Sequence, residues 1–170
     1  MRISDRRKYV NMDREFLKNY MKKVISVCHK RGALATGGMA AHLLNPDTDN
    51  SDLIDSVCQA KLKEINAGAD GFLVYDLNLV EPLHQLWSKP VQTGSEVAEE
   101  PVITGSSLLK IPTGGATMEG LEHNIAVGIL FIHSWISDGK GSFHFKGFVE
   151  DSATAEISRS HNPIIHFYFN

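Results

Sequence analysis

Two adjacent acidic residues, Glu150 and Asp151, stand in the stretch FVEDSATAEISR, residues 148–159. A carboxylate can act as a general base when it is held within hydrogen-bond reach of the proton that it removes. The stretch looks like the start of a short helix, and acidic residues are common in a first helical turn because they complement the helix dipole. Neighbouring residues of a helix point about 100° apart. We therefore expect at most one of the two carboxylates to face a site.

Other candidate chemistry has weaker support. The turn Gly37-Gly38-Met39 lacks the spacing of a phosphate-binding loop, so a structural turn is the simpler interpretation. Cys28 and Cys58 lie in amphipathic stretches without a basic cluster, and we expect reduced thiols that pack in a core. The histidines show no zinc-ligand spacing with cysteine or acid, at positions 29, 42, 84, 123, 133, 144, 161 and 166.

The composition of the chain excludes several kinds of binding partner and a location within a membrane. The chain has 170 residues, 42% of them hydrophobic, which is enough to build a buried core. Its net charge is -3 and its Lys and Arg residues are scattered, so neither nucleic acid nor an anionic membrane surface is expected as a partner. The longest apolar run, residues 125–135, falls short of the ~20 residues that a membrane span needs. The first residues lack the apolar core of a secretory signal.

The elements that must position these residues alternate between helix and strand. Apolar spacing predicts helices over residues 13–31 and 52–66, the second capped by Ser51. A small-residue strand over residues 33–36 is expected to open into the Gly37-Gly38 loop, and the apolar run 72–75 is typical of a parallel strand buried on both faces. This order predicts an α/β domain with a parallel sheet.

The second half of the chain is predicted to be more helical. Residues 88–105 are rich in Pro, Gly and acid and indicate a surface loop. A helix over residues 118–136 is expected to begin after a Thr117 cap. A short strand or turn, residues 142–148, then leads into the acidic helix, which Pro163 is expected to end, and residues 164–170 form an apolar, β-like tail. The apolar stripe of the 118–136 helix comprises Leu121, Ile125, Gly128, Ile132 and Trp135.

Four stretches together resemble one enzyme family. They are HKRGALATGGMAA (29–41), NAGADG (66–71), LEHNIAVGILFIHSW (121–135) and FVEDSATAEISR (148–159). In order and spacing they resemble the later part of malate synthase. The resemblance runs from about residue 4 to residue 159 and is weaker between residues 75 and 105. Its most specific motif is the last.

The resemblance implies an α/β fold: the C-terminal portion of a TIM (β/α)8 barrel followed by a helical segment. Residues 1–105 would be the last barrel units, residues 106–160 the start of a helical C-terminal domain, and residues 161–170 an atypical tail. Such enzymes condense acetyl-CoA with glyoxylate to give malate and CoA. The resemblance also implies that the complete enzyme uses Mg²⁺ to polarise the glyoxylate, with metal ligands on earlier strands that this chain does not contain.

The resemblance also assigns candidate site residues. The catalytic base of the family is the aspartate of the ED-AT motif, which falls on Asp151, with Glu150 as its neighbour. Gly37, Gly38 and Met39 match a Gly-Gly-Met turn that lines the substrate or acetyl-CoA site, and Glu150 is a further candidate for lining. No metal ligand falls within this chain.

We therefore expect a fragment of malate synthase that has no measurable activity alone and that associates through uncovered barrel edges. One alternative is a non-catalytic partner of a full-length subunit. Another is a related barrel lyase that acts on acyl-CoA thioesters. An intracellular location is expected, in peroxisomes, glyoxysomes or cytoplasm, although the final residues Phe-Tyr-Phe-Asn are not a peroxisomal address.

Overall fold

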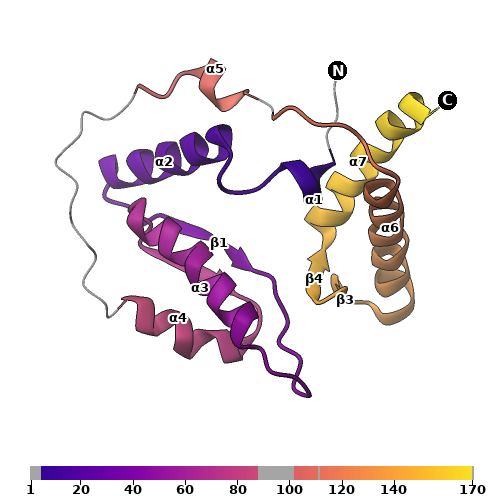
Figure 1. Ribbon diagram of the computed structural model, residues 1–170, viewed down its shortest axis with the longest axis horizontal. Helices are drawn as coiled ribbons and strands as arrows, with labels where there is room; N and C mark the ends of the chain where they lie inside the picture. Colours follow the sequence, from indigo (N-terminus) through magenta and orange to yellow (C-terminus); the bar gives the residue numbers. More distant parts are fainter. Residues whose placement is uncertain (1–4, 88–101, 111, 170) are drawn as a thin grey trace. The chain divides into compact units, whose positions relative to one another are not determined.

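The computed structural model describes residues 5–87, 102–110 and 112–169 (Figure 1). The chain divides into two compact units. Residues Glu15–Lys110 form the strand–helix unit. Met1–Arg14 together with Ile111–Asn170 form the hairpin unit. Each unit is described by itself below.

The strand–helix unit contains a parallel pair of strands joined by a helix. Strands β1 (Thr36–Ala40) and β2 (Gly71–Val74) pair in parallel, which confirms the predicted parallel arrangement. Within the described residues these two strands form no closed barrel. The helical elements of the unit are α2 (Glu15–Lys30), α3 (Ser51–Asn66), the 3₁₀ turn η1 (Leu77–Leu79), α4 (Val80–Trp87) and α5 (Gly105–Leu108).

The two helices predicted in this half are confirmed within a few residues, but the predicted Ser51 cap is wrong, because Ser51 begins α3 and Asn50 is its N-cap. The first strand is displaced. Gly37 and Gly38 lie inside β1, whereas the sequence placed them in a loop after a strand over residues 33–36. The pairing register shifts between Thr36 and Met39, so β1 carries a bulge at the two glycines. A contact from a residue distant in the sequence accompanies the bulge. Nζ of Lys61, on α3, donates to the Gly38 carbonyl at 2.6 Å.

One face of the two-stranded sheet is covered and the other is not. Ala40 packs with Val57, Leu79 and Leu83 in a core that α3 and α4 close. Successive strand residues point to opposite faces. The register partners Met39 and Leu73 therefore lie on the far face, where they are 42% and 58% exposed. In a closed barrel, the face opposite the helices is the interior, which side chains from all the strands fill.

The hairpin unit combines a long helix, an antiparallel hairpin and a second long helix. Helix α6 (Met118–Asp138) begins after Thr117, whose Oγ1 accepts a hydrogen bond from the Gly120 amide at 3.0 Å, and this confirms the predicted cap. The helix ends at Gly139 in the left-handed conformation. The remaining elements are α1 (Arg6–Tyr9), β3 (Ser142–Phe145), β4 (Phe148–Asp151) and α7 (Ser152–Phe169).

The predicted inner face of α6 is wrong. Ile132 and Trp135, two members of the predicted stripe, are 57% and 62% exposed. The helix buries Val127 and Phe131, which pack against Ala155 and the hairpin phenylalanines. Because residues 125–136 are apolar around most of the helix, periodicity alone does not select a face. The position of the hairpin selects it. The positions that α6 buries are Gly120, His123, Asn124, Val127, Phe131 and Ser134.

The predicted end of the last helix is also wrong. Glu150 and Asp151 belong to strand β4, and α7 then continues through Pro163 to Phe169, so the expected β-like tail is helical. The sequence argument used the bias of a residue before proline away from helix. That bias is a local preference, and helices that contain proline are its known exceptions.

The remaining sequence expectations concern cysteines and the membrane. Cys58 packs against the core under α3 and α4, Cys28 packs against the core around Ile25, and neither cysteine is in a disulfide. Their predicted role in packing is confirmed. Among the helices of the described residues, none combines the length and the apolar character that crossing a bilayer demands. Most of the predicted 88–105 loop lies outside the described residues.

Candidate functional site

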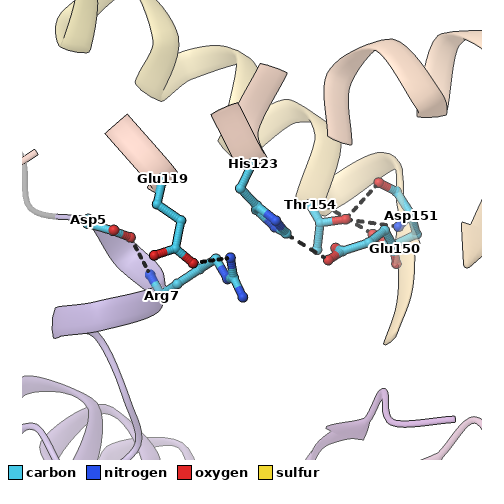
Figure 2. A network of polar contacts seen from close by, with 7 residues as sticks. All are labelled: Asp5, Arg7, Glu119, His123, Glu150, Asp151 and Thr154. Carbon is cyan, nitrogen blue, oxygen red and sulfur yellow. Dashed lines mark hydrogen bonds and ion pairs between the residues drawn. The ribbon is translucent and has the colours of Figure 1, made fainter. Parts of the chain in front are cut away.

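Asp151 stands at the junction of β4 and α7, where backbone geometry fixes its carboxylate (Figure 2). Its Oδ1 accepts hydrogen bonds from the amides of Ala153 at 2.9 Å and Thr154 at 3.1 Å. In return, Thr154 Oγ1 accepts from the Asp151 amide at 2.9 Å. This reciprocal arrangement is a helix cap of the capping-box kind. No described residue donates a hydrogen bond to Oδ2, so the half-buried side chain is oriented through one oxygen and keeps the other available.

Glu150 points away from Asp151. In the antiparallel hairpin Glu150 is paired with Phe143, and paired residues share a face of the sheet. Phe143 packs against the cluster formed with α6, so Glu150 also faces α6. Its side chain is 11% exposed, and its Oε1 lies 3.9 Å from Nε2 of His123. The two acidic residues of the motif therefore serve opposite faces of β4.

His123 is the polar residue of α6 that meets this carboxylate. It is 6% exposed, its ring centroid lies 5.4 Å from that of Phe145, and its Nδ1 is buried without a hydrogen-bond partner among the described residues. Burial lowers the pKa of His123, and the positive charges of Arg7, Lys146 and Arg6 lower it further, while Asp5 opposes them. The imidazole is therefore held in its neutral form over a wider pH range than a free histidine.

An N-terminal segment fastens the start of α6. Asp5 accepts from the amide of Arg7 at 3.0 Å and from the hydroxyl of Thr117, the cap residue of α6. A Cβ atom at Gly120 would lie 2.8 Å from the Asp5 carboxyl group, so glycine is required at that position. Nη1 of Arg7 lies 3.6 Å from Oε1 of Glu119. Asp5 thus joins the beginnings of α1 and α6, and Figure 2 shows its bond to the amide of Arg7.

The other candidate residues, Gly37, Gly38 and Met39, belong to the strand–helix unit. A side chain at Gly37 would overlap the carboxylate of Glu64, which is buried and accepts from Lys61 Nζ at 2.9 Å. A Cβ at Gly38 would meet no atom within 4 Å. Gly37 therefore has a packing reason to be glycine, whereas Gly38 faces open space. Asp151 lies in the other unit, so the two sets of candidate residues are described separately.

Within the described part of the chain, no group of three or more His, Cys, Asp and Glu side chains converges on a point that could hold a metal ion. The contact between His29 and Asp70 is structural. Oδ2 of Asp70 accepts from the Ala35 amide at 2.7 Å and lies 2.8 Å from Nε2 of His29. The Ala35 amide, and then His29, lower the pKa of Asp70. These bonds tie α2 to the segment before β1.

An apolar groove of about 340 Å³ runs between α6 and α7. Ser152 lines it, but Asp151 does not. Its other lining residues are Ile125, Gly128, Ile129, Phe131, Ile132, Ala155, Glu156 and Arg159.

Comparison with known proteins connects this geometry to a family. Residues 1–111 match the family described as malate synthase, TIM barrel domain, and residues 115–164 match malate synthase, C-terminal. The chain belongs to the malate synthase family. The ED-AT motif of β4 and α7 lies within the match to the C-terminal region of malate synthase, and the parallel pair β1 and β2 lies within the match to its barrel.

Curated malate synthases match nearly all of this chain. The malate synthase of Myxococcus xanthus (strain DK1622) is 38% identical over 89% of this chain and 29% of its own length. Malate synthase A of Escherichia coli (strain K12) is 36% identical over 94% of this chain and 31% of its own. The glyoxysomal malate synthase of Brassica napus is 37% identical, with shares of 95% and 30%. The chain thus spans about 30% of the length of these malate synthases.

His123 and Arg7 are the residues of this network that sequence reasoning missed. His123 was considered only as a metal ligand, and Arg7 only as part of a scattered charge distribution. A signal for His123 was present, because an imidazole in an otherwise apolar helix needs a polar partner when it is buried. The wrong assignment of the buried face of α6 hid that signal.

Proposed function

We propose that this chain forms one part of a malate synthase, in which acetyl-CoA, glyoxylate and water give malate and CoA. We further propose that Asp151 is the catalytic base. The observation that carries the proposal is the position of Asp151. The residue that matches the catalytic aspartate of the motif is a half-buried N-cap whose Oδ1 is held by two backbone amides. A positioned carboxylate is what general-base catalysis requires.

In the proposed reaction, a carboxylate oxygen of Asp151 removes a proton from the methyl group of acetyl-CoA. The enolate carbon then attacks the aldehyde carbon of glyoxylate, and the carbonyl oxygen gains a proton. Water next attacks the thioester carbon, so that the carbon–sulfur bond breaks and CoA leaves as the thiol. Because Oδ1 is engaged by the helix cap, Oδ2 is the oxygen that is free to accept the methyl proton.

Mg²⁺ is proposed only for the complete enzyme. The described residues supply no set of three His, Cys, Asp or Glu side chains for it. The described residues therefore do not fit a metal site by themselves, and no step above depends on one. We infer that the segments that complete the enzyme carry the ligands, since the curated relatives are about three times as long as this chain.

The lining of the substrate or acetyl-CoA site by Gly37, Gly38, Met39 and Glu150 remains a proposal with unequal support. Gly38 and Met39 have exposed positions, and Gly38 has open space beside its Cα. Gly37 is accounted for by its contact with Glu64. Glu150 faces α6 and His123, which supports an indirect role for it in place of contact with substrate.

We infer that the chain alone has no synthase activity and associates with other polypeptides. Two observations support this: the strands described are too few for a barrel, and Met39 and Leu73 lie exposed on the face that a barrel interior would cover. For location, several relatives are named glyoxysomal, and we propose the same kind of compartment or the cytoplasm for the complete protein.

A hybrid enzyme tests this function. Residues 4–159 of the chain replace the corresponding segment of the Escherichia coli relative, and release of the CoA thiol is followed with acetyl-CoA, glyoxylate and Mg²⁺. We expect turnover by the hybrid and none by the 170-residue chain. We expect Asp151→Asn to lower kcat of the hybrid by about 10²- to 10⁴-fold, the range for loss of a general base.

The matched control is His133→Gln, an exposed substitution on α6, which should leave kcat unchanged. Turnover by the chain alone would contradict the inferred inactivity. A folded hybrid that keeps its activity with Asp151→Asn would exclude Asp151 as the base.

A further inference from the structure

The contact between Glu150 and His123 is unusual because both side chains are largely shielded from water and the imidazole keeps a buried nitrogen without a hydrogen-bond partner among the described residues. Their side chains are 11% and 6% exposed. At 3.9 Å, the separation of Oε1 and Nε2 is too long for a hydrogen bond, and it becomes an ion pair when the imidazole is protonated. Nδ1 of His123 has no hydrogen-bond partner among the described residues. A buried imidazole nitrogen without a hydrogen bond is costly, so the position of His123 in α6 needs a reason to be retained.

The location of the pair suggests the reason. Glu150 is joined by one peptide bond to Asp151, and the Asp151 amide donates to Thr154 Oγ1 in the α7 cap. Glu150 faces α6 and Asp151 faces the cap, so the peptide between them is held from both sides. A movement of the Glu150 side chain therefore shifts the peptide group that joins it to Asp151, and with it the hydrogen bonds of the α7 cap.

We propose that His123 is a positioning residue for Asp151: through Glu150 it holds β4 against α6 and so fixes the orientation of the proposed base at the start of α7. The inference rests on the proposed function for its catalytic meaning. The mechanical link between His123 and the cap does not depend on catalysis. Both can therefore be tested separately.

The charges around His123 make the link sensitive to pH. Glu119 lies on α6 one turn before His123 and contacts Arg7. Burial lowers the pKa of the imidazole, Arg7 and Arg6 of the N-terminal segment and Lys146 of the hairpin turn lower it further, and Asp5 opposes them. The carboxylate of Glu150, on β4, lies 3.9 Å from Nε2 of His123. Burial and then the positive charge of Arg6 lower the pKa of His161, on α7. Protonation converts the pair from one negative charge to a neutral ion pair, which strengthens the attraction of Glu150 to α6.

The first test uses the 170-residue chain and NMR. The C2 proton of His123 and the amides of Asp151 and Thr154 are followed between pH 5 and pH 8. We expect the two amides to shift with the same midpoint as His123. In Glu150→Gln the midpoint of His123 should move to lower pH, since the anion that favours the protonated imidazole is lost. Amide shifts of Asp151 and Thr154 that stay flat through the titration of His123 would overturn the proposal.

Variants of His123 give a second readout. His123→Gln keeps a neutral donor that can reach Glu150, and it should retain the amide positions of the cap but lose their titration. His123→Leu removes the polar contact and should displace the amides of Asp151 and Thr154 at every pH. His133→Gln, on the exposed side of the same helix, should leave the titration of the cap unchanged. If His123→Leu does not fold, the titration of the unmodified chain and of His123→Gln still decides the question.

In the hybrid enzyme the same variants separate positioning from binding. We expect His123→Leu to lower kcat about tenfold or more with KM for acetyl-CoA little changed, and His123→Gln to restore most of kcat. A fall in kcat that His123→Gln does not restore would contradict positioning through Glu150. Loss of activity in Asp151→Asn tests the proposed base, whereas coupled amide shifts test the link. The two ideas can therefore fail independently.

Discussion

At the scale of single residues, Asp151 combines two tasks that make different demands on its carboxylate. Oδ1 accepts two amide hydrogen bonds and begins α7, which is a structural task. The proposed chemical task falls to Oδ2. An Asp-to-Asn substitution separates the two, because asparagine is as good a helix cap as aspartate but cannot act as a carboxylate base.

The first prediction uses this separation. In the 170-residue chain, Asp151→Ala should lower the free energy of unfolding by about 1 kcal/mol through loss of the cap, whereas Asp151→Asn should change it by only a few tenths. Urea unfolding followed by far-UV circular dichroism measures both. Equal destabilisation by the two substitutions would mean that the charge of Asp151, and not its capping bonds, stabilises the start of α7.

The second prediction concerns the loss of folding stability at acidic pH. Burial lowers the pKa of His42, His123 and His161 in the folded chain. The unfolded chain then binds more protons, so stability should fall as pH drops below about 6.5, the ordinary value for histidine. Urea midpoints at pH 7.5 and pH 5.5 measure the loss. His123→Gln should reduce it, and an unchanged loss would contradict a contribution from His123.

The carboxylates affect the stability of the chain in a lower range of pH. Hydrogen bonds from backbone amides lower the pKa of Asp70 and Asp76 in the folded chain. Their contribution to stability is present above the unfolded value, near 4, and is lost as pH falls further.

At the scale of elements, the sequence correctly predicted helices, a helix cap and a strand pairing that depend on residues close together in the chain. Apolar spacing located α2, α3 and α6, and Thr117 was recognised as a cap because side-chain capping is a local interaction. The parallel pairing of β1 and β2 followed from the alternation of helix and strand. These predictions involve residues close together in the chain.

The errors came from contacts between distant residues. In the bulge of β1, the Gly38 carbonyl accepts a hydrogen bond from Lys61 of α3, which lies 23 residues later in the chain. The buried face of α6 depends on where the hairpin packs, and α7 continues through Pro163 although the local preference opposes it. The candidate base was found through its motif. Its partners His123 and Glu150, by contrast, meet only after α6 and β4 have packed together.

The bulge gives the third prediction. Gly37→Ala places a Cβ where the Glu64 carboxylate lies, and should destabilise the strand–helix unit by about 1–3 kcal/mol, as overpacking does. Gly38→Ala is the matched control in the adjacent position. Its Cβ meets nothing within 4 Å, and we expect its effect to be near zero. Urea unfolding of the two variants measures the difference, and equal effects would contradict the requirement for glycine at residue 37.

At the scale of the whole molecule, apolar surface remains uncovered in both units. The strand–helix unit exposes Met39 and Leu73 on one face of its sheet. The hairpin unit exposes the isoleucines of α6 that border the groove, including Ile129. Contiguous apolar surface of this kind favours association in water.

The fourth prediction tests the second of these surfaces. Ile129→Lys introduces a charge into the groove and should weaken self-association of the chain, which sedimentation velocity measures over a range of concentrations. Leu34→Lys is the control, because Leu34 is exposed but does not border this groove. If Ile129→Lys leaves the association unchanged, the α6 groove is not the surface through which copies of the chain meet.

The membership of residues 1–14 in the hairpin unit has a topological consequence. The chain enters that unit, leaves it to build the strand–helix unit, and returns at residue 111, so one unit is inserted within the other. Nζ of Lys110 and Oε2 of Glu15 are 2.6 Å apart, which places the entry and exit points of the insert close together. A short peptide could accordingly join residue 110 to residue 15, so that the excised strand–helix unit becomes a cyclic chain. A single cut by a protease in the full chain would sever the backbone without releasing either unit whole.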